Sequence, residues 1–379
     1  MARRVWPFKP ISPVLDIQSW FTDVFRAKSS EQRIRLRASP ARILQYSYLL
    51  DDYDLSYAQA LLRANQGADG FYVPDWTQAD AVGGLTSGSG VVVPVDISDR
   101  VYSDEALVWQ SPAENERVAV AADSNGLTID TLVNSYTNAT VLPLWYGDAP
   151  EGIEADKLGA WRNSLAIGFV LDGAEPYGGS SYTQYRGLDV VPDCPVLAGG
   201  LGVGYTQELS SFGNGVGNTE YIRQRDLAEV TFELRWKKFT SEEHAVLRDW
   251  VATRYGRLCA FWVTSSSKDL EPAAEINGTT VTVFNDVIVR DPVYHLEILV
   301  NDGTRYYRQV TASASGTEIN GRETADLTID GSITSLSVAS IKRISYLYCA
   351  RFDSDRVEYE FTAPGILTLV MPCREVPEP

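Results

Sequence analysis

Residues that could support catalysis are scarce in this chain of 379 residues. It holds only two histidines, His244 and His295, so Ser–His and Cys–His nucleophile pairs have little to draw on. Its four cysteines include no pair at the two-residue spacing of zinc or redox sites. We therefore expect reduced, mostly buried cysteines, a helical packing role for His244, and no catalytic residue.

Oxygen ligands and phosphate loops are also poorly represented. The clusters Asp51-Asp52-x-Asp54 and Asp353-Ser354-Asp355 do not continue into a twelve-residue calcium loop. The glycine-rich residues 199–204 lack the Lys-Ser/Thr pair of a P-loop. The sequence thus predicts no metal, no cofactor and no enzyme. Paired carboxylates for glycoside hydrolysis are defined in space, so a carbohydrate-binding or glycoside-cleaving β protein used in host attachment stays open as the alternative.

The element that organises the chain is a strand, helix, strand unit at residues 227–263. Its first strand alternates apolar and polar residues, and Thr240 with Glu243 forms a capping box at the start of the helix. An apolar stripe then runs along the helix until Gly256, and a short apolar strand follows. The residues that we expect to anchor the core of this unit are Phe232, Trp236, Trp250, Phe261 and Trp262.

The same unit occurs at residues 42–73, which indicates a tandem duplication. Asp99 and Asp291 are 192 positions apart, and five further identities near them share this offset. Residues 127–130 return as residues 327–330, and residues 165–169 match residues 357–361 by their alternation. Residues 13–15 are likewise repeated at residues 195–197. A repeat this long indicates two fused domains and not a solenoid.

Composition and turn signals predict a mainly β fold. The 20 tyrosines, 9 tryptophans and 29 glycines favour strands joined by tight turns, and dipeptides such as Asn277-Gly278 and Asp330-Gly331 suit hairpins. We expect residues 1–82 with 165–190 to form the first large domain and residues 191–270 with 355–379 the second. A small β insertion is expected in each, at residues 83–164 and 271–354.

Charge and hydropathy limit the partners. A net charge of −17 argues against tight, sequence-independent binding of nucleic acid. No segment is apolar enough to predict a membrane span or a signal peptide, so we expect a protein that folds in the cytoplasm. The proline- and aromatic-rich start of the chain predicts an extended arm, with Trp6 and Phe8 as residues that dock on a neighbouring protein.

Three stretches resemble distal tail proteins, the tail-tip or baseplate proteins of long-tailed, siphovirus-type bacteriophages and of gene transfer agents. They are residues 225–236 with the helix and the Gly256-Arg257-Leu258-x-x-Phe261-Trp262 motif that follow, residues 20–24 with 31–33, and residues 351–355 with 374–377. The resemblance implies a tail-tube-like β-sandwich with one flanking helix, stacked under the tail tube and joined to the hub and the fibres. The chain departs from that family because it is doubled.

The duplication and the resemblance together predict how copies associate. A tail tube of this type is sixfold and the tip beneath it is commonly threefold. Three doubled chains would supply six tube-like domains, so we expect a trimeric, pseudo-hexameric ring in preference to a hexamer. The expected partners are other copies of the chain, the tail tube protein above, the hub and fibre proteins below, and DNA that passes without specific binding.

Overall fold

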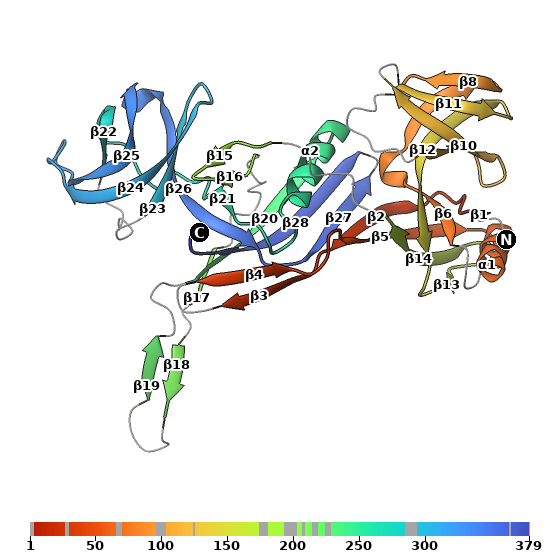
Figure 1. The fold of residues 1–379 in the computed structure, drawn as a ribbon, viewed down its shortest axis with the longest axis horizontal. Coiled ribbons are helices and arrows are strands. Elements are labelled where there is room, and N and C mark those ends of the chain that lie inside the picture. The colour runs from red at the N-terminus through yellow and green to blue at the C-terminus, as the bar shows by residue number, and fades with distance from the viewer. Residues whose placement is uncertain are drawn as a thin grey trace.

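The computed structural model describes residues 4–26, 30–65, 70–95, 104–123, 126–173, 181–192, 203–206, 209–213, 219–223, 229–284, 294–363 and 365–378. Within these ranges the protein is mainly β with two α-helices, as the sequence predicted (Figure 1). Residues 99–102, 195–202 and 225–228, and with them Cys194, carried part of the sequence argument and lie outside the described residues.

The first half of the chain contains the helix α1 and the strands β1 to β14. Its elements are β1 (Arg4–Val5), β2 (Ile11–Ser19), β3 (Thr22–Arg26), β4 (Glu31–Arg35), β5 (Ala41–Leu50), α1 (Asp52–Ala64), β6 (Phe71–Pro74), the 3-10 helix η1 (Trp76–Gln78), β7 (Asp80–Leu85), β8 (Gly88–Val93), β9 (Glu105–Trp109), β10 (Asn115–Asp123), β11 (Gly126–Leu132), β12 (Tyr136–Asp148), β13 (Glu154–Lys157) and β14 (Asn163–Asp172). A small hairpin, β15 (Gln184–Tyr185) and β16 (Leu188–Asp189), follows.

The second half has a similar order of elements. They are β17 (Val203–Thr206), β18 (Leu209–Phe212), β19 (Glu220–Arg223), β20 (Glu229–Lys238), α2 (Ser241–Ala252), β21 (Phe261–Thr264), β22 (Ile276–Phe284), β23 (Tyr294–Val300), β24 (Arg305–Ser315), β25 (Thr324–Leu336), the 3-10 helix η2 (Val338–Ser340), β26 (Ile341–Phe352), β27 (Arg356–Ala363) and β28 (Ile366–Glu375).

The strand pairings of the first half recur in the second. β5 lies between β2 and β14, and β20 lies between β17 and β28. β14 also pairs with β12 and β13, as β28 pairs with β26 and β27. The hairpin β3–β4 corresponds to β18–β19, and β6 and β21 pair with β12 and β26. The tandem duplication predicted from the sequence is therefore present in the fold.

Each half contains a small β insertion with a core of its own. In the first, β9 pairs with β10 and β12, β10 with β11, and β11 with β8. In the second, β23 pairs with β24 and β26, β24 with β25, and β25 with β22. Separate clusters of buried aliphatic residues fill the two insertions.

Two details of the predicted repeat are wrong. Residues 165–169 belong to β14, whose counterpart by pairing is β28 and not β27; β27 corresponds to β13. Residues 154–164 were expected in the first insertion, but β13 and the start of β14 belong to the large sheet. Alternating strands look alike in sequence, so periodicity identified the strands without identifying their neighbours.

The sequence predicts Thr240 as the cap of the second helix and Asp54 as the cap of the first; the structure confirms Thr240, but α1 begins three residues earlier than predicted. The Thr240 side chain accepts a hydrogen bond from the Glu243 backbone N–H (3.2 Å), and the Glu243 carboxylate accepts one from the Phe239 N–H (3.0 Å). The Thr240 half of the capping box is thus as expected, while the Glu243 carboxylate reaches back to the residue before the cap. In α1 the cap is Asp51 and not Asp54, because the Asp51 side chain accepts from the Asp54 N–H (2.7 Å).

Candidate assembly interface

The two halves join edge to edge into one large sheet. Residues 14–19 of β2 pair antiparallel with residues 356–361 of β27. The pairings therefore run without a break in the order β13, β14, β5, β2, β27, β28, β20, β17 (Figure 1). One face of this sheet and both helices share a single hydrophobic core. The halves thus form a continuous structure and not two domains on a linker.

The five predicted anchors are all buried, and four of them lie in this shared core. Trp250 of α2 is fully buried and contacts the rings of Trp236 (5.9 Å between centroids) and Phe261 (5.1 Å). Phe232 belongs to the same core. Trp262 points to the opposite side of β21, where it packs 4.5 Å from the His295 ring in a separate cluster.

The predicted docking arm at the start of the chain does not face a partner. Trp6 and Phe8 are fully buried in the first half's own core, and β1 pairs with β6. The Trp6 indole N–H donates to the Tyr48 hydroxyl (3.0 Å), and its ring packs against Phe8 and Phe169. Aromatic residues in a proline-rich stretch signalled burial correctly, but the surface that buries them belongs to the same chain.

A buried ion network crosses the junction of the halves. Asp16 of β2 accepts hydrogen bonds from Arg42 of β5 (2.9 and 3.0 Å) and from Arg248 of α2 (2.6 Å). Arg42 also donates to Asp75 (2.9 Å). Burial alone would raise the pKa of Asp75, but Arg42 and Arg248 outweigh it and lower that pKa to about 2. These residues were not singled out from the sequence; the signal was an aspartate at an inward position of an otherwise apolar strand.

The large sheet ends in two edges. In the described part of the chain β13 pairs only with β14, and β17 pairs only with β20. β13 and β17 are the counterparts of β27 and β2, the two strands that join the halves. In the part of the chain that the structure describes, each member of the internal junction thus has a counterpart strand with one unpaired edge, at opposite ends of one sheet (Figure 1).

The backbone of β13 is oriented for pairing in the same way as that of β27. The Leu158 N–H donates to the Arg162 carbonyl (3.0 Å), and hydrogen-bonded pairs alternate along an antiparallel ladder. Ala155 and Lys157 therefore direct their backbone N–H and C=O groups away from β14. The side chains of Ala155 and Lys157 lie on the helix side of the sheet, as do those of Val357 and Tyr359 of β27. The backbone N–H and C=O groups of Val357 and Tyr359 face β2.

The face of the sheet opposite the helices is polar and carries both acidic and basic side chains. Glu233 and Arg235 of β20 form an ion pair, and so do Arg356 and Glu358 of β27. All four side chains are exposed. In these two described strands the basic side chains are paired with acidic ones, unlike the basic stripes that bind nucleic acid phosphates.

The histidines and carboxylates considered in the sequence make contacts within the chain. Burial lowers the pKa of His244, which contacts the Lys238 carbonyl, and that of His295, which contacts the Tyr185 hydroxyl (3.1 Å). Asp353 and Asp355 bind arginines, and Asp51 caps α1. Among the described residues no group of three His, Cys, Asp or Glu side chains is arranged to hold a metal ion, and no helix is long and apolar enough to cross a membrane.

No model of a known protein family matches the sequence, and no curated protein matches it with significant similarity.

Proposed function

We propose that this protein is a structural component of a virion, a distal tail protein at the tail tip of a long-tailed bacteriophage, where it ends the tail tube and connects it to the hub and fibres. The observation that carries the proposal is the junction of β2 with β27. This junction joins two equivalent units edge to edge. It leaves the counterpart strands β13 and β17 each with one edge that has no strand partner in the described part of the chain.

Repeating that junction between copies gives a closed ring. If β17 of one copy pairs with β13 of the next, each junction between copies repeats the junction within a copy. Heterologous contacts of this kind close when the rotation between units divides a full turn. Three copies then form a ring of six tube-like units, which matches a sixfold tube on one side and a threefold tip on the other.

The proposed partners follow from this position. They are further copies of the chain, the tail tube protein above, and the hub and fibre proteins below. DNA passes through the ring without specific binding, which suits a net charge of −17 and a mixed-charge sheet face. The protein has no enzymatic role in this proposal and assembles in the host cytoplasm.

Electron microscopy of the virus particle tests the proposal. A gold-labelled antibody to this chain should mark the end of the tail. Labelling elsewhere on the particle would contradict the proposal. A monomeric protein that binds or cleaves glycans would instead favour a carbohydrate-binding role in host attachment.

A further inference from the structure

Within the chain, the hairpin β3–β4 of the first half docks on the second half. Glu31 accepts two hydrogen bonds from the buried Arg351 (2.6 and 3.1 Å). Arg33 donates to the Leu258 carbonyl (2.7 Å), and the Arg35 guanidinium lies over the Tyr255 ring (4.4 Å). These three residues lie on one face of the hairpin, because alternate residues of a strand share a face.

The residue just before this hairpin fills a space in the second half. Trp20 is buried and packs edge-on against Tyr255 (5.2 Å), beyond the C-terminal end of α2. Its backbone N–H donates to the Asp355 carbonyl (2.8 Å), in the turn that leads into β27. Gly256 lies so close that a Cβ there would be 2.9 Å from the Trp20 Cβ. The space that Trp20 fills is therefore bounded by the residues that follow α2 and by the turn before β27.

The hairpin β18–β19 is the counterpart of β3–β4, but most of its side chains in the described part of the chain are exposed. Its pairing starts with Leu209 opposite Arg223, as that of β3–β4 starts with Thr22 opposite Arg35. The spacing to the next strand is also the same, because β20 begins at Glu229 after β19 ends at Arg223, and β5 begins at Ala41 after β4 ends at Arg35. Figure 1 shows β18–β19 projecting from the body of the molecule.

The face of β18–β19 that corresponds to the docked face of β3–β4 exposes large side chains. By register Leu209 corresponds to Thr22, and Tyr221 corresponds to Arg33. Leu209 is 44% exposed and Tyr221 is 65% exposed. The opposite face exposes Phe212 (62%) and Ile222 (52%), so several large apolar side chains of this hairpin are open to a contact with another protein. The choice of the Leu209 and Tyr221 face rests on its correspondence to the docked face of β3–β4.

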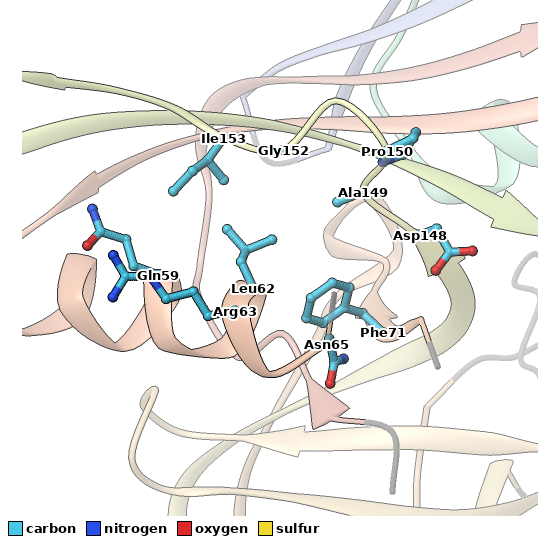
Figure 2. A pocket seen from close by; sticks show the side chains of 10 residues that line it. All are labelled: Gln59, Leu62, Arg63, Asn65, Phe71, Asp148, Ala149, Pro150, Gly152 and Ile153. Carbon is cyan, nitrogen blue, oxygen red and sulfur yellow. The ribbon is translucent and has the colours of Figure 1, made fainter. Parts of the chain in front are cut away.

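The first half has an open pocket where the second half is filled. A cavity of about 830 Å³ lies between the end of α1, the start of β6 and the turn before β13. Leu62, Phe71 and Ile153 give it apolar walls, and Arg63, Asn65 and Asp148 are polar groups at its border (Figure 2). Phe71 corresponds to Phe261, since each begins the strand that pairs with β12 or β26.

We propose that the hairpin β18–β19 of one copy docks into this pocket on the first half of the next copy. The proposal rests on the edge-to-edge ring proposed above, because pairing of β17 with the next copy's β13 brings the following hairpin to the pocket beside β13. By the same correspondence the hairpin face with Leu209 and Tyr221 turns toward the rim of the pocket, as the face with Thr22 and Arg33 turns toward the second half within the chain. Ile222 lies on the other face of the hairpin and turns away. The partner recognised by the hairpin is therefore a second copy of this chain.

Site-specific photo-crosslinking tests the contact directly. A photoreactive phenylalanine analogue at position 221 of the full-length protein, in the assembled ring, should yield a product of two chains. Its crosslinked peptides should contain residues from 59–65 or 148–153. The matched control carries the same analogue at position 222, which is 52% exposed on the opposite face, and should give far less of this product. Equal yields from both positions, or crosslinks to other surfaces only, would overturn the proposal.

Charge substitutions separate this inference from the proposed ring. Tyr221→Asp should weaken ring assembly by about tenfold or more, because a buried tyrosine at an interface is a frequent energetic anchor, whereas Ile222→Asp should assemble like the wild type. Rings that form equally well with Tyr221→Asp would overturn hairpin docking and leave the ring intact. A wild-type protein that never assembles would instead contradict the proposed function.

Discussion

At the scale of single residues, the junction of the halves depends on charges removed from water. Asp16 is fully buried, and its two arginine partners come from β5 in the first half and α2 in the second. A buried ion pair contributes little when compared with apolar residues of the same shape, but removing one partner is costly because the other charge stays buried. The network therefore fixes how the second half sits against the first.

Acid should destabilise the protein through Asp75. Its pKa in the folded protein is about 2, below the usual value of 3.8, so the carboxylate stabilises the fold above about pH 4. This contribution, about 2 kcal/mol, should be lost as the pH falls through 2. Urea unfolding of the wild type and of Asp75→Asn across pH 7 to 2 measures it. The gap in unfolding free energy between them should narrow with acid; a gap independent of pH would contradict the assignment.

Trp250 should be among the costliest core residues to truncate. It is fully buried between α2 and the strands, so Trp250→Ala leaves a large cavity and should lower the unfolding free energy by about 3–5 kcal/mol. Chemical denaturation measures this difference. The matched control is Trp161→Ala, at a side chain that is 79% exposed, which should change stability by no more than about 0.5 kcal/mol. Similar effects of the two substitutions would show that Trp250 is not a core anchor.

At the scale of elements, the proposed assembly depends on the edge strands β13 and β17. β13 has the short sequence Glu-Ala-Asp-Lys with every side chain exposed, and charge on an edge strand is a usual protection against uncontrolled pairing. Its outward backbone groups remain suitable for one specific neighbour. Because β13 is short and charged, we expect it to pair with the next copy only when the other contacts between the two copies also form.

A proline at the free edge should block ring closure without unfolding the chain. The Ala155 N–H points away from β14, so Ala155→Pro removes a hydrogen-bond donor for the next copy and keeps the ladder within the chain. Native mass spectrometry should show rings for the wild type and monomers for this variant. Ala155→Thr, which retains the N–H, serves as the control and should form rings. Normal rings with Ala155→Pro would exclude β13 as the closing edge.

At the scale of the whole molecule, the duplication supplies half of the junctions in the proposed ring, because three of its six junctions lie within chains, one in each copy. The ion network, the Trp20 contact and the β3–β4 hairpin hold that junction in place. In the proposed ring, the corresponding contacts between copies form through β17, β18–β19 and the pocket beside α1. Ring formation should therefore depend on protein concentration, whereas the internal junction does not.

The assembled ring should contain three chains. Its mass should be three times 41.9 kDa, and class averages in electron microscopy should show six similar lobes with threefold differences between neighbours. Native mass spectrometry and negative-stain images of purified rings provide these measurements. A ring of six chains, or a stable monomer in the mature particle, would contradict this stoichiometry.

The sequence by itself determined the elements of this protein and their repetition. Alternation from Val230 to Trp236 predicted β20, the Thr240 capping box predicted the start of α2, and matching segments predicted the tandem duplication. These are local properties, set by side-chain periodicity and by hydrogen bonds between residues close in the chain, so a sequence pattern records them directly.

Only the tertiary structure decided which elements are neighbours. Trp6 and Phe8 were expected on a partner and lie in the chain's own core, and the strand matched to β14 proved to be the counterpart of β13. Periodicity shows that a side chain must be buried, but it does not show against what surface. The free edge at β13 and the pocket beside α1 depend on strands and turns that are distant in sequence, and therefore only the folded chain reveals them.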